Sequence, residues 1–218
     1  MIAIIDYGMG NIHSVKKAVE SMGASAQVTD KPQDLERAEK IIFPGVGAFG
    51  DALVELKQRG LDEAIKKSVR SGKAFLGICL GLQVLFEESA ESAGVKGLGL
   101  LKGKVKKFPL QKGLKIPHMG WNQIKKVTRS PCLSGRQAGH QVTGVCPLLK
   151  NIPDNAYVYF CHSYYPEPKE SDVIAASTDY GIDFAAVVWQ DNIYGVQFHP
   201  EKSQDVGLEI LKNFVEQC

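Results

Sequence analysis

Strand-like and helix-like segments alternate along the first 80 residues of the chain. Short runs rich in apolar residues have the length expected of buried strands; they occupy 2–6, 25–29, 40–44 and 73–78. Between these runs, 11–22 and 48–70 repeat their apolar residues at helical spacing. This alternation predicts a doubly wound α/β fold, with a mostly parallel central sheet and helices on both faces.

The second half of the chain has a different pattern, in which strand-like segments follow one another with turn signals between them. One pair of segments flanks Asp191 and Asn192, which is typical of the tip of a β-hairpin. We therefore expect an antiparallel-rich second half. A last stretch at 204–216 predicts a helix, with Leu208, Leu211 and Val215 on one apolar face.

Composition narrows the class of protein. With 218 residues and no repeat or linker, residues 1–218 are interpreted as a single domain. The 26 basic and 24 acidic residues nearly balance, which gives no electrostatic argument for binding nucleic acid or a membrane. The five cysteines include no C-x-x-C pair, so neither a disulfide framework nor a zinc site is indicated. We expect a cytoplasmic protein without a metal or cofactor.

Cys79 follows the strand-like run at 73–78 directly, and glycines stand two residues before and after it. The apolar segment 81–86 predicts a helix that begins just after this thiol. A single cysteine is more often a small buried side chain than a nucleophile. Open α/β sheets, however, bind ligands at the carboxyl ends of their strands, and a helix N-terminus stabilises a thiolate. Cys79 is therefore the candidate nucleophile, presented at a sharp turn between strand and helix.

A thiolate enzyme needs a base, and five histidines compete for that role. His199 and Glu201 stand two residues apart around Pro200, so in an extended segment their side chains project to the same side. A carboxylate in that position fixes the tautomer of the imidazole, as in a catalytic triad. A solvated charged pair is the alternative. His118 and His162 remain rivals, each as a structural histidine or as part of a binding site.

The glycine-rich segment at 45–50, GVGAFG, matches the pattern of a dinucleotide-binding loop and follows a strand-like run. That type of loop also needs an acidic residue at the end of the next strand. Asp62 and Glu63 have about the right separation, but they fall in a helical pattern. We therefore favour a loop whose backbone amides face a ligand of another kind.

Six stretches, in order along almost the whole chain, resemble the class I (triad) glutamine amidotransferases. They are IIDYGMGNIHSV, IIFPGVGAFGDA, FLGICLGLQVLFEES, IPHMGWN, YFCHSYY and YGVQFHPEKS. The G-x-C-x-G and H-P-E motifs identify the broad class. DYGMGN and HMGWN are similar, within that class, to the glutaminase subunits of imidazole glycerol phosphate synthases.

The resemblance implies a role for each matching residue. Cys79 would attack the side-chain amide of glutamine, His199 would act as the base, and Glu201 would orient that base. The oxyanion donors would come from the loop after the third strand and from the residue after the nucleophile: Val46, Gly47 and Leu80. The ends of the glutamine substrate would be held by a further set: Gln83, Glu91, His162, Ser163 and Tyr164.

The resemblance also implies a partner, a (βα)8-barrel cyclase subunit that forms a heterodimer with this chain and receives its ammonia. Three residues fall where the family meets that subunit: Asn11, Trp121 and Lys202. One stretch departs from the family pattern, because residues 131–146 stand where the family continues almost directly. We interpret 131–146 as an insertion in a surface loop, which a fold tolerates at small cost.

Two other functions stay open from the sequence alone. A related Cys-His-Glu hydrolase, such as a γ-glutamyl hydrolase, would cleave a peptide-like amide without any partner. A binding module could keep the fold and perform no chemistry, although intact Cys79, His199 and Glu201 argue against it.

Overall fold

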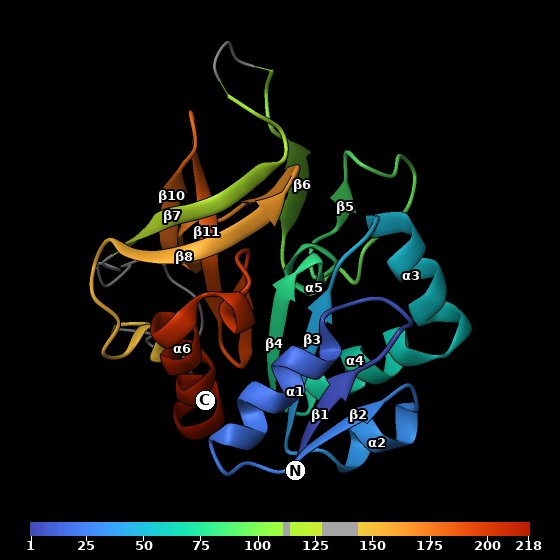
Figure 1. Cartoon of the computed structure of the whole chain (residues 1–218). Helices are drawn as coiled ribbons and strands as arrows, with labels where there is room; N and C mark the ends of the chain where they lie inside the picture. The colour runs from blue at the N-terminus through green and yellow to red at the C-terminus, as the bar shows by residue number, and fades with distance from the viewer. Residues whose placement is uncertain (111–113, 128–143) are drawn as a thin grey trace.

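The computed structural model of the chain describes residues 1–110, 114–127 and 144–218, and one nine-stranded sheet runs through these residues (Figure 1). Its strands, in spatial order, are β2 (Ala26–Thr29), β1 (Ile2–Ile5), β3 (Lys40–Gly45), β4 (Ala74–Cys79), β12 (Ile193–Val196), β11 (Asp183–Gln190), β10 (Ile174–Asp179), β7 (His118–Lys126) and β8 (Ala156–His162). Pairs from β2 to β12 are parallel, and pairs from β12 to β8 are antiparallel. The sheet is therefore mixed: the predicted parallel arrangement is confirmed for its first part, and the antiparallel-rich second half is confirmed as well.

Helices cover both faces of the parallel half. The helices α1 (Ile12–Ser21) and α6 (Gln204–Gln217) pack on one face, and α2 (Pro32–Arg37), α3 (Phe49–Gln58) and α4 (Leu61–Arg70) pack on the other. Along β1, Ile2 and Ile4 join the first hydrophobic cluster, whereas Ala3 and Ile5 join the second. A strand buried on both faces needs an uninterrupted apolar sequence, which explains the runs in this half.

The short helix after Cys79 is the main departure from the predicted elements. A helix was expected over 81–86, but α5 spans only Leu80–Gln83. Beyond it, the carbonyl oxygens of residues 84–86 accept hydrogen bonds from backbone amides of the loop 98–101. The helix ends because its next carbonyls bond to this loop instead. The chain then enters a small sheet formed by β5 (Glu88–Ser89), β6 (Gly103–Lys107) and β9 (Tyr164–Pro168).

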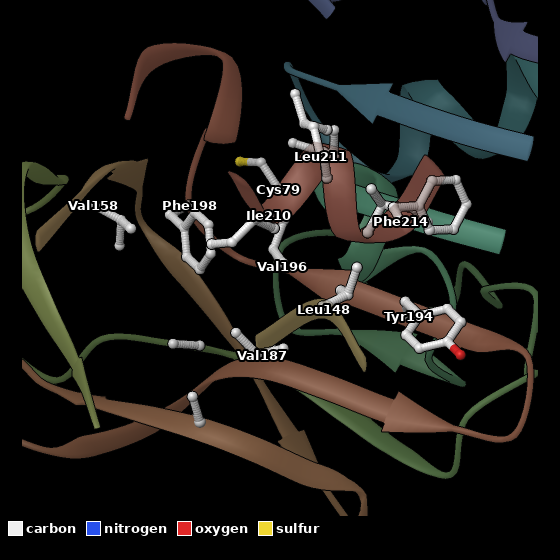
Figure 2. Packing of buried hydrophobic residues seen from close by; sticks show 14 of the residues in the cluster. Cys79, Leu148, Val158, Val187, Tyr194, Val196, Phe198, Ile210, Leu211 and Phe214 are labelled. Carbon is white, nitrogen blue, oxygen red and sulfur yellow. The ribbon is translucent and has the colours of Figure 1, made fainter. Parts of the chain in front are cut away.

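The C-terminal helix α6 forms as expected, but one residue of its predicted apolar face is not buried. Leu208 is 40% exposed. The buried face instead follows helical spacing through Gly207, Ile210, Leu211 and Phe214. Figure 2 shows the last three of these side chains together with Val196 and other apolar residues of one hydrophobic cluster. Within the described ranges, no helix is long and apolar enough to cross a membrane.

Most of the predicted insertion lies outside the described residues, because the described chain resumes at Gly144. Gly144 and Val145 are exposed, whereas Cys146 is buried. Cys146 immediately precedes the 3₁₀ helix η1 (Pro147–Leu149) and joins the same hydrophobic cluster. The described end of the segment 131–146 therefore packs against the core. The other short 3₁₀ helices are η2 (Ser171–Val173) and η3 (Pro200–Lys202).

Candidate active site

Cys79 lies at a strained turn between β4 and α5. Its backbone has φ 54° and ψ −107°, a conformation that residues other than glycine rarely adopt. The two flanking glycines allow this turn, since a Cβ on Gly77 would collide with the backbone of Gly81. A Cβ on Gly81 would in turn collide with the carbonyl oxygen of Phe43 on β3. Strain of this kind is found at sites where the fold presents a reactive group, and here it presents the thiol.

His199 and Glu201 lie next to this turn because β12 is the neighbour of β4 in the sheet. Val196 at the end of β12 pairs with Ile78, so the residues that follow the two strands are brought together. His199 Nδ1 lies 3.0 Å from Glu201 Oε1, and both side chains are almost completely buried. The predicted pair is therefore an enclosed one, whereas the alternative was a solvated pair.

Hydrogen bonds fix the backbone around His199. Its amide donates to the carbonyl oxygen of Tyr159 on β8 (2.9 Å). The Ser203 hydroxyl donates to the His199 carbonyl oxygen (2.7 Å) and accepts from the Tyr159 amide (2.9 Å). The imidazole therefore sits on a loop that is tied to the antiparallel half of the sheet.

The surroundings of His199 favour its protonated form. Burial lowers its pKa, but hydrogen bonds with Cys79 and Glu201 and their negative charges act the other way. The result is a pKa raised from 6.5 to about 10. An imidazolium beside a thiol is the arrangement that stabilises a thiolate nucleophile.

A buried chain of side chains links the thiol to a residue expected to bind substrate. Gln197 Nε2 lies 3.6 Å from Cys79 Sγ and donates toward it. Gln197 Oε1 accepts a hydrogen bond from Gln83 Nε2 (3.1 Å), which also donates to the Tyr164 carbonyl oxygen (2.9 Å). Gln197 was not singled out from the sequence. Its position two residues before His199 could have predicted a place in the site, since alternate residues of an extended segment share a side.

The rival histidines form a separate hydrogen-bonded series. His162 Nδ1 donates to the Tyr164 carbonyl oxygen (2.8 Å), and His162 Nε2 lies 3.1 Å from His118 Nδ1. Asn122 Nδ2 donates to the remaining nitrogen of His118 (3.3 Å). Burial lowers the pKa of His162 to about 3 and that of His118 to about 4. Both imidazoles are neutral and already hydrogen-bonded, so the geometry favours His199 as the base.

Two further residues expected to bind substrate, Glu91 and Ser163, are hydrogen-bonded to backbone amides. Glu91 Oε2 accepts a hydrogen bond from the Phe49 amide (2.7 Å), at the start of α3. The carbonyl oxygen of Ser163 accepts a hydrogen bond from the Phe108 amide (3.2 Å). Glu91 and Ser163 are therefore held by backbone amides of neighbouring segments.

The loop after β3 packs against the start of α5, where Leu80 follows the thiol. A Cβ on Gly45 would lie 2.9 Å from the Gly81 amide nitrogen. The next amide, that of Val46, donates to the Tyr7 hydroxyl (3.0 Å), and the same hydroxyl donates to the Val46 carbonyl oxygen (2.8 Å). Tyr7 stands in the DYGMGN motif, but it was given no role from the sequence, because an aromatic residue after an apolar strand is typical of the core.

The three residues expected at a partner interface have different surroundings. Trp121 is 46% exposed on β7, and its ring centre lies 6.1 Å from that of Tyr159. Lys202 Nζ lies 5.8 Å from the centre of the same Tyr159 ring. Asn11 is partly buried, and its side-chain amide donates to Glu201 Oε1 (3.3 Å). Asn11 thus connects the expected interface to the carboxylate beside His199.

Comparison with known proteins assigns this fold and site to a class. A sequence profile described as "Glutamine amidotransferase class-I" matches residues 3–218. The solved "Structure of PurLQS from Thermotoga maritima" superposes with a TM-score of 0.71 at 19% identity, over 98% of this chain and 96% of that chain. At this identity the superposition supports the fold alone, and it agrees with the profile. The chain belongs to the class I glutamine amidotransferase family.

Proteins with higher sequence identity to this chain assign it to one family within the class. "Imidazole glycerol phosphate synthase subunit HisH" of Acinetobacter baylyi is 46% identical, over 99% of this chain and 97% of the relative. The protein of the same name from Syntrophotalea carbinolica is 49% identical, over 98% of each chain. Within the amidotransferases, the chain therefore belongs to the HisH family of synthase subunits. The resemblance stated from the sequence motifs is confirmed.

Proposed function

We propose that this chain hydrolyses glutamine to glutamate and ammonia, and that Cys79 performs the covalent step. The observation that carries the proposal is the buried His199–Glu201 pair beside a thiol held at a strained strand-to-helix turn. A histidine with a raised pKa next to a cysteine is suited to a thiolate mechanism.

The steps follow from the positions of these groups. The Cys79 sulfur attacks the side-chain carbonyl carbon of glutamine, and the resulting oxyanion accepts hydrogen bonds from the Leu80 and Val46 amides. The protonated His199 gives its proton to the departing ammonia, which leaves a glutamyl thioester on the sulfur. His199 then takes a proton from water, and the hydroxide releases glutamate and restores the thiolate. Glu201 orients the imidazole throughout.

The ammonia has a further destination in this proposal. The similar proteins are named as subunits of imidazole glycerol phosphate synthase. We infer that this chain pairs with a (βα)8-barrel cyclase subunit, which uses the ammonia to make imidazole glycerol phosphate in histidine biosynthesis. The exposed Trp121 and the Lys202–Tyr159 contact supply an aromatic and cationic surface beside the triad for such a partner. Both subunits would act in the cytoplasm.

The experiment is to measure ammonia release from glutamine by the chain alone, with the cyclase subunit, and with the cyclase subunit plus its nucleotide ligand. We expect slow hydrolysis by the chain alone and a marked rise when cyclase and ligand are both present. Equal rates in all three conditions would instead favour a hydrolase that works without a partner. No ammonia release in any condition would contradict the proposal as a whole.

A further inference from the structure

Tyr7 is placed to control one of the oxyanion donors. It lies two residues beyond the end of β1 and is 1% exposed, and its ring meets that of Phe43 edge-on with centres 5.2 Å apart. The polar end of this buried ring reaches the loop after β3. There its hydroxyl makes both of its hydrogen bonds with a single residue, Val46.

These two bonds hold two consecutive peptide units. The Val46 amide belongs to the Gly45–Val46 peptide, and the Val46 carbonyl belongs to the Val46–Gly47 peptide. Burial raises the pKa of Tyr7, so its hydroxyl keeps its proton at neutral pH. It can therefore donate to the carbonyl oxygen and accept from the amide at the same time.

The amide that bonds to Tyr7 cannot also serve an oxyanion. A backbone N–H has one hydrogen, so the Gly45–Val46 peptide must rotate before Val46 can donate to a substrate oxygen. The flanking residues permit such a rotation, because Gly45 has no side chain and Gly47 already has φ +99°. Val46 itself is 40% exposed, so little side-chain packing opposes the change.

We propose that Tyr7 is a positioning residue that holds the Val46 amide away from the oxyanion and thereby keeps glutamine hydrolysis slow in the unpartnered chain. This inference rests on the proposed function. The segment 6–11 carries Tyr7 and also Asn11, whose amide contacts Glu201. It also carries Met9, whose sulfur would lie 3.2 Å from a Cβ on Gly47. A partner that binds at Asn11 thus acts on the segment that holds the loop.

The test is Tyr7→Phe, which keeps the ring against Phe43 and removes only the hydroxyl. We expect kcat for glutamine in the chain alone to rise at least ~10-fold and at most ~10³-fold, the upper limit of what one oxyanion donor contributes. KM should change little, because the donor acts on the transition state. The rate with cyclase and nucleotide ligand should stay near that of the parent, so the stimulation falls by the same factor.

Two controls separate this role from a general loosening of the fold. Tyr194→Phe removes another buried tyrosine hydroxyl, on β12, and should leave the rate of the chain alone unchanged. Alkylation of Cys79 by iodoacetamide forms no oxyanion, so its rate should be the same in the parent and in Tyr7→Phe. A parallel rise in alkylation, or an equal rise in hydrolysis with Tyr194→Phe, would overturn the proposal.

The remaining outcomes separate a failure of the role of Tyr7 from a failure of the proposed function. If the parent complex releases ammonia but Tyr7→Phe alone is no faster than the parent alone, the role of Tyr7 is wrong and the proposed function stands. If the parent releases no ammonia even with cyclase and ligand, both are wrong.

Discussion

The two halves of the sheet contribute different kinds of groups to the candidate site. The parallel half contributes backbone: the amides of Leu80 and Val46, and the strained turn that carries Cys79. The antiparallel half and the loop after β12 contribute side chains such as His199 and Gln197, which are buried and hydrogen-bonded on several sides.

The two sets of groups also differ in how firmly the surrounding structure holds them. The side chains of His199 and Gln197 are 3% and 0% exposed, and a change in their positions would leave buried polar groups without partners. Val46 is 40% exposed by comparison, and its amide and its carbonyl oxygen both bond to one hydroxyl, that of Tyr7. In the proposed mechanism, the position of the acid–base group His199 is therefore set by the fold, while the proposed oxyanion donor depends on the orientation of one peptide.

The largest effect is expected when the parallel half loses its thiol. Cys79→Ala should abolish glutamine hydrolysis, because no other group in the site is positioned to form the covalent intermediate. The complex should still make product from added ammonium salts, since the cyclase reaction does not need the thiol. Measurement of both reactions on the purified complex checks this.

A matched control for that substitution is Cys218→Ala, at the C-terminal end of α6, which should keep full activity. Glutamine-dependent turnover by the folded Cys79→Ala variant would contradict the assignment of the nucleophile.

A second comparison sets two buried histidines against each other: His199 in the loop after β12 and His162 at the end of β8. His199→Ala should lower kcat by ~10²–10⁴, the usual contribution of a positioned acid–base group. His162→Ala should lower kcat much less, because its nitrogens already bond to His118 and to the Tyr164 carbonyl oxygen. Steady-state kinetics of both variants checks the order.

His162→Ala should also lower the free energy of unfolding. The substitution leaves the buried His118 Nδ1 without its partner, at about 1–3 kcal/mol, whereas the Tyr164 carbonyl oxygen keeps its hydrogen bond from Gln83. Denaturant unfolding measures this loss. A severe kinetic defect in His162→Ala with a mild one in His199→Ala would instead indicate that His162 is the base.

The fold could be predicted from the sequence wherever burial alone determines the order of apolar and polar residues. Runs such as 2–6 and 73–78 are apolar throughout because their strands are buried on both faces, and the hairpin at Asp191 forms where its turn residues predict it. The end of α5 could not be read in this way. Its length depends on bonds to the loop 98–101, and no local pattern in the sequence reports such distant contacts.

Site residues could be predicted from the sequence where they lie close to one another along the chain. His199 and Glu201 could be paired because two residues of extended chain separate them, and Cys79 could be singled out by its place after a strand. The contact between Tyr7 and Val46 joins residues 39 positions apart, and that between Gln197 and Cys79 joins residues 118 apart. Contacts of this kind arise from the strand order, which the sequence pattern leaves open.

The smallest expected effect comes from a change that keeps the shape of the His199–Glu201 pair and removes its charge. Glu201 Oε1 accepts from His199 and from the Asn11 amide, and Glu201→Gln can keep one acceptor at that place. The activity should therefore fall less than in His199→Ala. The pKa of His199 should fall below about 10, because one of the groups that raises it has lost its charge.

The sign of the accompanying stability change follows from that shift. A histidine whose folded-state pKa lies above 6.5 contributes stability that is complete below pH 6.5 and is lost as pH rises through about 10. The parent should therefore exceed Glu201→Gln in unfolding free energy most at pH 6, and the difference should shrink toward pH 10. NMR titration of the His199 ring and denaturant unfolding across this range measure both effects, with the exposed Glu216→Gln on α6 as control. If the pKa of His199 is the same in the parent and in Glu201→Gln, the carboxylate does not hold the proton on the imidazole. The raised pKa of His199 would then depend on Cys79 alone.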